Sequence, residues 1–161
     1  MLWGWGRMPL LQLSVFVENR PGEMAKVASI LDKSGVKIFA LSIADAGEAG
    51  LIRMVVNDPE KATQQLEAAG LTLAKSKKNV EVIAVLVTED HKLSEITKIL
   101  SDNNINIDYA YSSSILVDGK SAMILRVSDP EKSEKILEGK GVKVLRIEDL
   151  RILFAFSYFN L

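Results

Sequence analysis

The first half of the chain begins with apolar residues at every second position. Leu11, Leu13, Val15 and Val17 recur with a period of two, which is typical of a half-buried β-strand that ends near Glu18. The period then changes. Apolar positions follow helical spacing from Gly22 to a stop at residue 35.

Two more strands and a second helix complete this half. Apolar runs over 36–44 and 50–57 flank the turn DAGEAG, and a fourth short strand, LTLAK, follows the second helix. Asp58 and Pro59 are the preferred residues for the start of that helix, and Gly70 ends it. The element order is therefore βαββαβ.

The second half of the sequence repeats the first. VVNDPEKATQQLEAAGLTL (55–73) aligns with RVSDPEKSEKILEGKGVKV (126–144), and ASILDKSGVKI (28–38) aligns with TKILSDNNINI (97–107). The offsets of the two blocks differ by two residues, which predicts an insertion in a hairpin. Two blocks in the same order indicate an internal duplication.

The repeat assigns the remaining elements. The second half is expected to contain strands over 80–88, 105–116, 121–128 and 141–146, and helices over 91–103 and 130–139. The fold class is α+β: two βαββαβ units, each an antiparallel sheet with its helices on one face. We expect an N-terminal extension over 1–9, units over 10–78 and 79–147, and an apolar C-terminal tail over 148–161.

Composition excludes several functions. Among 161 residues, 20 are basic and 21 are acidic, so nothing favours a nucleic-acid partner. Without cysteine and with a single histidine, the chain offers neither disulfides nor a multi-histidine metal site, and we expect no metal or cofactor. No apolar run is long enough to span a membrane, and MLWGWGRM lacks the apolar centre of a secretory signal. The cytoplasm is the expected compartment.

No catalytic constellation stands out. The chain has no cysteine, no histidine beside a suitable nucleophile and no carboxylate pair marked by spacing. Glu60 and Glu131 are explained as acidic residues in the first turns of helices. We therefore predict a protein that is not an enzyme.

The strand–helix junction ENRPGEM, residues 18–24, is the strongest candidate for binding. A helix start exposes unpaired N–H groups, and Gly22 lets a ligand approach the backbone, so the amides of Glu23 and Met24 suit a carboxylate. Asn19 offers a donor and acceptors for an α-amino or α-carboxyl group. A phosphate site would show more glycines or a lysine. The alternative is that the junction is only a favourable turn.

These features resemble tandem ACT-domain proteins, which are small cytoplasmic modules that sense amino acids. The resemblance rests on the two βαββαβ units, LSVFVENRPGEMAKVASIL and the NDPEK…L…G block, and it extends from about Leu10 to Arg146. It implies ferredoxin-like units whose second strands pair edge to edge. It also implies a free amino acid bound where the first strand–helix loop of one unit meets the second strand of its neighbour. The ligand-binding candidates on the first loop are Asn19, Arg20, Pro21, Gly22, Glu23 and Met24.

The second copy departs from this pattern. Its loop TEDHKL (88–93) lacks Pro and Gly, and its Glu89 and Asp90 would repel a carboxylate. We expect His91 to face solvent, and one competent site per chain.

The strand YAYSSS (109–114) supplies the remaining candidates. By the family geometry Tyr109 and Tyr111 would wall a side-chain pocket, and Ser112 and Ser113 would bind the amino group. The alternative is that the tyrosines are ordinary sheet residues.

Two features suggest association. The strand VKIFALSIA is apolar on both faces, with Ile38 and Ala40 on one and Phe39, Leu41 and Ile43 on the other. Something must cover the second face, either another chain or the terminal extensions, and we predict a homodimer that buries the face around Phe39, Leu41 and Ile43. The extension around Trp3 and Trp5 and the tail ILFAFSYFNL, with Tyr158 and Phe159, are rich in aromatic residues. The tail is interpreted as an added strand, a dimer contact or a membrane-surface segment, and the lack of a basic flank favours the protein contact over the membrane.

The predicted function is a small regulatory module. It would bind a free amino acid, apolar or aromatic, between its two units and signal by a change of conformation or association, with a metabolic enzyme as a candidate partner. One alternative is a regulatory subunit of acetolactate synthase, because LSVFVEN…G…V also resembles the start of that subunit. The second ACT-like copy argues against this alternative, because it stands in place of the subunit's distinct C-terminal region. The other alternative is a structural dimerisation protein that binds no ligand.

Overall fold

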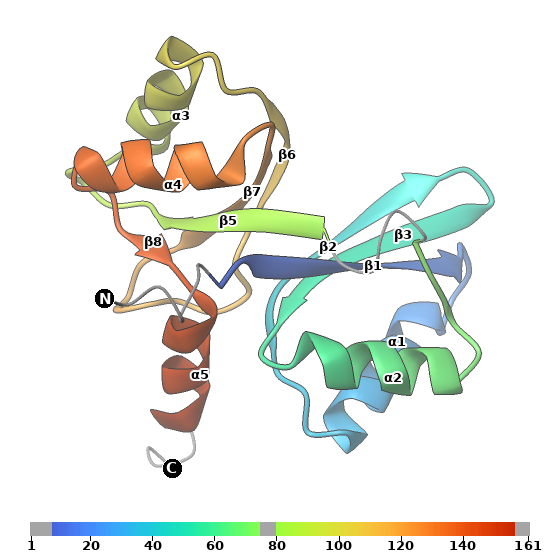
Figure 1. Ribbon diagram of the computed structural model, residues 1–161. Coiled ribbons are helices and arrows are strands. Elements are labelled where there is room, and N and C mark those ends of the chain that lie inside the picture. The colour runs from blue at the N-terminus through green and yellow to red at the C-terminus, as the bar shows by residue number, and fades with distance from the viewer. Residues whose placement is uncertain (1–7, 75–79, 157–161) are drawn as a thin grey trace. The chain divides into compact units, whose positions relative to one another are not determined.

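Two compact units make up the chain. The structure, a computed structural model, describes residues 8–74 and 80–156. The first unit is formed by Leu11–Val80; the second is formed by the residues from Glu81 onward and also contains Leu10. Figure 1 traces a βαββαβ order through each unit, followed by one further helix at the end of the chain. The predicted α+β class with two ferredoxin-like units is confirmed.

The elements of the first unit are β1 (Leu10–Glu18), α1 (Glu23–Lys33), β2 (Ile38–Ala46), β3 (Ala49–Val56), α2 (Pro59–Ala68) and β4 (Thr72–Leu73). Those of the second are β5 (Val80–Leu86), α3 (Leu93–Asp102), β6 (Ile107–Ser112), β7 (Ala122–Val127), α4 (Pro130–Gly139) and β8 (Val144–Leu145). Helix α5 (Ile147–Phe156) follows.

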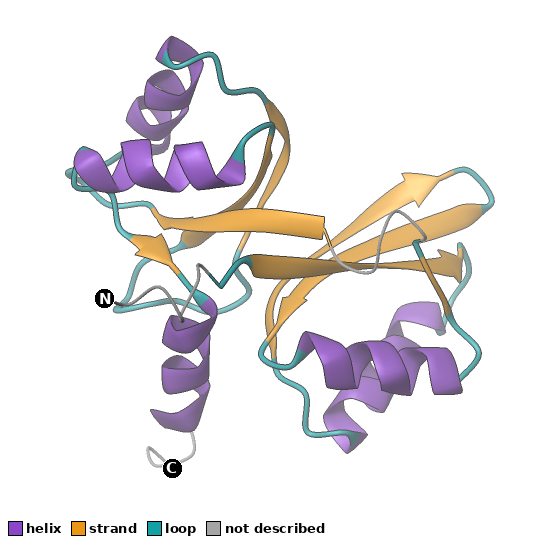
Figure 2. Cartoon of the chain, in the orientation of Figure 1, coloured by secondary structure: helices purple, strands orange, loops and turns teal. Residues whose placement is uncertain are grey.

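Each unit is a two-layer structure with a core between its sheet and its helices. The antiparallel strands follow the order β2-β3-β1-β4 in the first unit and β6-β7-β5-β8 in the second. Figure 2 shows α1 and α2 on one face of the first sheet and α3 and α4 on one face of the second. The first core cluster contains Leu13, Val15, Val27, Leu31, Val36, Ile52, Met54, Val56, Ala62 and Leu66. The second contains Ile83, Val85, Ile96, Leu100, Ile105, Leu125, Val127, Leu137, Val142 and Val144. Burying such side chains contributes roughly 1.5–3 kcal/mol each.

A β-bulge changes the faces of the second strand. Ile38 pairs with Val56 and Ala40 pairs with Val55, which leaves Phe39 as an extra residue in β2. Two residues of a bulged strand then oppose one residue of its partner, so Phe39 and Ala40 lie on the same side of the sheet.

The face assignment predicted for this strand is therefore wrong beyond the bulge. Leu41 and Ile43 stand opposite Met54 and Ile52, two residues of the core beneath the helices. They share the helix-covered face, and Leu41 packs against that core. Strict alternation from Ile38 placed them on the other face because it took no account of the extra residue.

The homodimer stays a prediction, with a revised surface. Within residues 8–74 and 80–156, β2 is an edge strand with β3 as its one partner, and Ile43 on it is 54% exposed. An open edge carrying an exposed apolar residue favours pairing with a second copy. We expect sedimentation at micromolar concentration to give twice the 17.7 kDa mass of the chain, and Ile43→Lys to shift the protein toward monomer. A wild-type protein that sediments only as a monomer would contradict this.

The duplication extends to local detail. The side chains of Asp58 and Asp129 accept hydrogen bonds at 3.1 Å from the backbone N–H groups of Lys61 and Lys132, as expected of caps. In β6 the register shifts at Asp108, the position equivalent to the bulge in β2. The two copies therefore share caps and strand irregularities as well as element order.

The C-terminal segment forms a helix where an added strand was one of the alternatives. Residues 152–156 belong to α5, so that alternative is wrong for them. Glu148 and Asp149 lie in the first turn of the helix, and Asp149 Oδ2 accepts a 2.7 Å hydrogen bond from the backbone N–H of Arg146. This contact satisfies a donor at the helix start, as a capping residue does. Trp3, Trp5, Tyr158 and Phe159 lie outside the described residues.

Candidate functional site

The predicted binding loop joins β1 to α1 and is tied to a neighbouring hairpin. The Asn19 backbone N–H donates to the Glu48 carbonyl at 3.1 Å. Its side-chain amide donates to the Gly47 carbonyl at 3.4 Å and lies 3.5 Å from Asp45 Oδ1. Because Asn19 connects the loop to the β2–β3 turn, its amide group already has partners. A ligand would be left with the side-chain oxygen.

Gly22 occupies the position at which α1 begins. Its φ of +92° lies in the left-handed region, and no side chain caps the helix. A Cβ at Gly22 would meet no atom within 4 Å. Among the described residues the N–H groups at the start of α1 thus have no capping side chain, which is the arrangement that suits an anion.

Arg20 is neutralised by two carboxylates. It lies 2.7 Å from Glu18 Oε2 through one Nη and 2.9 Å from Glu23 Oε1 through Nε. The hydrogen bond with Glu23, together with the charges of Glu18 and Glu23, raises the pKa of Arg20 above its ordinary value. The Glu23 side chain is only 14% exposed. Arg20 thus holds the loop rather than offering an unpaired charge.

A cleft of about 410 Å³ opens beside this loop within the first unit. Its lining residues are Phe16, Val17, Glu18, Arg20, Glu23, Lys26, Glu48, Ala49, Gly70, Leu71 and Thr72. Arg20 and Glu23 are the predicted site residues among them; Asn19, Pro21, Gly22 and Met24 do not line it. Its volume falls within the range of small-molecule sites.

Sequence reasoning missed the wall formed by Gly70, Leu71 and Thr72. Thr72 pairs with Phe16, so the turn before β4 lies beside the last residues of β1. The signal was present in Gly70, which was interpreted only as the end of α2. Its φ of +82° makes the turn that brings β4 back to the sheet.

The equivalent loop of the second unit is shorter and is held by hydrogen bonds between its own residues. Residues 88–95 separate Val87 from Ile96, one residue fewer than residues 18–26 in the first unit. The Thr88 N–H donates to the His91 carbonyl and the His91 N–H donates to Thr88 Oγ1, both at 3.0 Å. The expectation that His91 faces solvent is wrong, because its side chain is only 24% exposed.

The ligand-binding candidates on β6 lie in two different environments. Tyr109 and Tyr111 stand opposite Arg126 and Ile124, on the face away from the second core cluster. Ser112 is exposed at the end of the strand. Their predicted contact with the ligand stays a prediction.

Ser113 has a local structural use. Its hydroxyl donates to the Ile115 carbonyl at 2.6 Å and accepts from the Ala122 N–H at 3.1 Å. These two bonds close the β6–β7 hairpin. The hydroxyl that was predicted to bind the ligand's amino group is therefore already engaged, as donor and as acceptor, within the hairpin.

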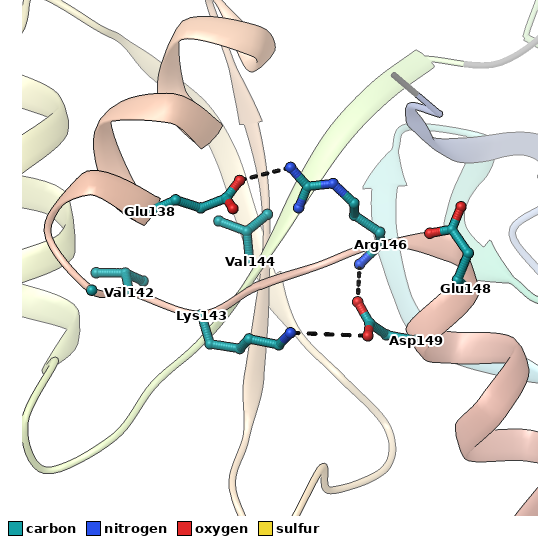
Figure 3. A pocket seen from close by; sticks show the side chains of 8 residues that line it. Glu138, Val142, Lys143, Val144, Arg146, Glu148 and Asp149 are labelled. Atoms are coloured by element: carbon teal, nitrogen blue, oxygen red, sulfur yellow. Dashed lines mark hydrogen bonds and ion pairs between the residues drawn. The ribbon is translucent and has the colours of Figure 1, made fainter. Parts of the chain in front are cut away.

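The second unit contains its own cleft, of about 470 Å³, at the start of α5 (Figure 3). Arg146 reaches across it to Glu138 at 2.7 Å, and Lys143 lies 4.0 Å from Asp149. The hydrogen bond with Glu138 is the largest of the effects that raise the pKa of Arg146 above its ordinary value. Since these charges neutralise one another, the cleft fixes the entry to α5 rather than forming a charged ligand site.

Neither a metal site nor a membrane-spanning helix is found among the described residues. Across residues 8–74 and 80–156, no three acidic or histidine side chains lie together as a metal site would require. No helix in the same segments is both long and apolar enough to cross a membrane.

Comparisons with known proteins are consistent with the architecture. Residues 8–154 match the family model described as an ACT domain pair. Protein BT0572 from Bacteroides thetaiotaomicron shares 28% sequence identity at a TM-score of 0.77, over 89% of this chain and 96% of that one. A comparison with curated proteins found no significant match.

Two more distant structures share the fold. The regulatory subunit of aspartate kinase from Thermus thermophilus, in its ligand-free form, is 13% identical at a TM-score of 0.57, covering 83% of this chain and 93% of that one. Its counterpart from Thermus flavus is 15% identical at a TM-score of 0.53, covering 82% and 90%.

Proposed function

The chain belongs to the family of ACT domain pairs, and on that premise we propose that this ACT-type regulatory module binds a free amino acid at the Asn19–Met24 loop. ACT domains are regulatory rather than catalytic units. The proposed module is cytoplasmic and passes its signal to a metabolic enzyme by a change of conformation or association.

The observation that carries this proposal is the backbone at Gly22. The start of α1 has no side-chain cap, and the space where a Cβ would stand is empty. A ligand carboxylate is the complement of such a site, because it accepts from the first amides and is stabilised by the helix dipole.

Charges beside the loop fit a zwitterion. Lys26 lies one turn into α1 and Glu48 lies in the β2–β3 turn, and both line the cleft. Arg20 is already neutralised by Glu18 and Glu23. The cleft therefore offers one further cation for a carboxylate and one anion for an ammonium group.

Apolar residues in the same cleft suit the ligand's side chain. Phe16, Val17 and Leu71 contribute to its lining, and Phe16 is 42% exposed. This composition supports an apolar or aromatic amino acid, because burying apolar area is the main favourable term for such a side chain.

A thermal-shift screen of the twenty amino acids tests the proposal. A bound amino acid at about 100 times its Kd should raise the free energy of unfolding by roughly 2.7 kcal/mol, and hence Tm. We expect apolar or aromatic amino acids to give the largest shift, with their D-enantiomers as controls. A protein that only mediates dimerisation would show no shift with any of them.

A further inference from the structure

The internal duplication allows the β1–α1 loop of the first unit to be compared with the equivalent β5–α3 loop of the second. Val27 and Leu31 of α1 correspond to Ile96 and Leu100 of α3, since each pair forms the buried positions of its helix. Extending that alignment to the helix starts places His91 at the position of Gly22.

The turn that faces this loop has the same backbone conformation in both copies. Gly70 and Gly141 follow equivalent helices and have φ values of +82° and +84°. A Cβ on Gly70 would meet nothing within 4 Å, whereas a Cβ on Gly141 would meet His91 Nε2 at 3.4 Å and Cε1 at 3.8 Å. The imidazole thus lies over Gly141, in the space that is open at Gly70.

His91 is held in this place by its own loop. The reciprocal hydrogen bonds with Thr88 fix its backbone. Its buried Nδ1 meets no hydrogen-bond partner among the described residues and lies 3.7 Å from Glu95 Oε2. A buried ring nitrogen without a hydrogen bond is costly, so packing of the ring against the turn must offset that cost.

We propose that His91 is an internal occupant of the space between the 88–95 loop and Gly141 in the second unit. Its imidazole fills the space that an amino acid is proposed to occupy in the first unit. That space is consequently closed to ligands in the second unit, and each chain carries one open site of this kind. The comparison with the first unit's ligand and the single open site rest on the proposed function; the occupancy of the space beside Gly141 by His91 does not.

Chemical rescue tests the occupancy directly. His91→Ala removes the ring and leaves a space of its shape, which free imidazole matches. We expect the variant to have a lower Tm than wild type, and added imidazole to raise that Tm saturably, by roughly 2–4 °C for each kcal/mol of binding free energy gained. Imidazole should leave the wild-type Tm unchanged, because the space beside Gly141 is already filled.

Two further variants make the result interpretable. Asp90→Ala, at the exposed neighbouring position, should be as stable as wild type and insensitive to imidazole. If His91→Ala does not fold, His91→Leu fills the space without a hydrogen bond, and it should fold and ignore imidazole. His91→Ala with wild-type stability and no imidazole response would overturn the proposal, as would a His91→Leu variant that binds imidazole. Since no amino acid is used, these outcomes are independent of whether the first unit binds one.

Discussion

A chain carrying Gly22→Asp is expected to bind its amino acid at least a hundredfold more weakly than wild type. The new carboxylate would stand in the open space before the first amides of α1, where the ligand's carboxylate is proposed to lie. Repulsion at that distance and the loss of the amide hydrogen bonds together should cost at least 2–3 kcal/mol. Calorimetric titration of both proteins with the amino acid found in the screen measures the difference.

The effect of the added charge on binding has to be distinguished from the strain that any side chain causes in the left-handed backbone at Gly22. Any side chain at a φ of +92° adds about 1–2 kcal/mol of strain, although asparagine tolerates this region better than most residues. Gly22→Asn is the matched control, because it has nearly the same shape as Gly22→Asp without the charge. It should retain most of the affinity that the aspartate removes. Equal binding by wild type and a folded Gly22→Asp would mean that the loop is only a turn.

The largest effect on stability is expected from Leu66→Ala. Leu66 is fully buried on α2 within the first core cluster. Removing its side chain leaves a cavity as well as a loss of transfer free energy, which together cost about 2–5 kcal/mol. Denaturant unfolding should show this decrease as a lower midpoint with little change in slope.

Two other alanine substitutions, one in each unit, serve as comparisons for Leu66→Ala. Leu137 is the equivalent residue on α4 and is also fully buried, so Leu137→Ala should destabilise the protein to a similar degree. Gln65→Ala, one residue before Leu66 and exposed, should change the unfolding free energy by less than about 0.5 kcal/mol. A Leu66→Ala protein as stable as the Gln65→Ala protein would contradict the assigned core.

Much of the fold could be predicted because its signals are local. Asp58 and Asp129 are capping residues followed by proline, and the structure shows both caps. The repeated blocks fixed the element order of the second unit even where a strand such as β8 is only two residues long. Such signals depend on a few neighbouring residues, so they survive without knowledge of the tertiary packing.

What escaped prediction depends on contacts distant in sequence or on backbone details. The bulge at Phe39 changes the side on which Leu41 and Ile43 lie, and no residue type marks it. The cap of α5 is made by Asp149, which accepts from the N–H of Arg146 before the helix. The apolar run after it was interpreted as an added strand, a dimer contact or a membrane-surface segment, because a short apolar run does not by itself distinguish strand from helix. His91 is covered by Gly141, fifty residues later in the chain, a contact that no local pattern encodes.

The most direct test of the proposed site is to map the amino acid onto the backbone by NMR. Titration of the labelled wild-type protein should shift the amide resonances of Gly22, Glu23 and Met24 most strongly and saturably. The equivalent amides of His91 and Lys92 should change little, because that loop is proposed to be closed. Saturable shifts that leave Gly22–Met24 unaffected, or none with any of the twenty amino acids, would contradict the assignment of this loop as the binding site.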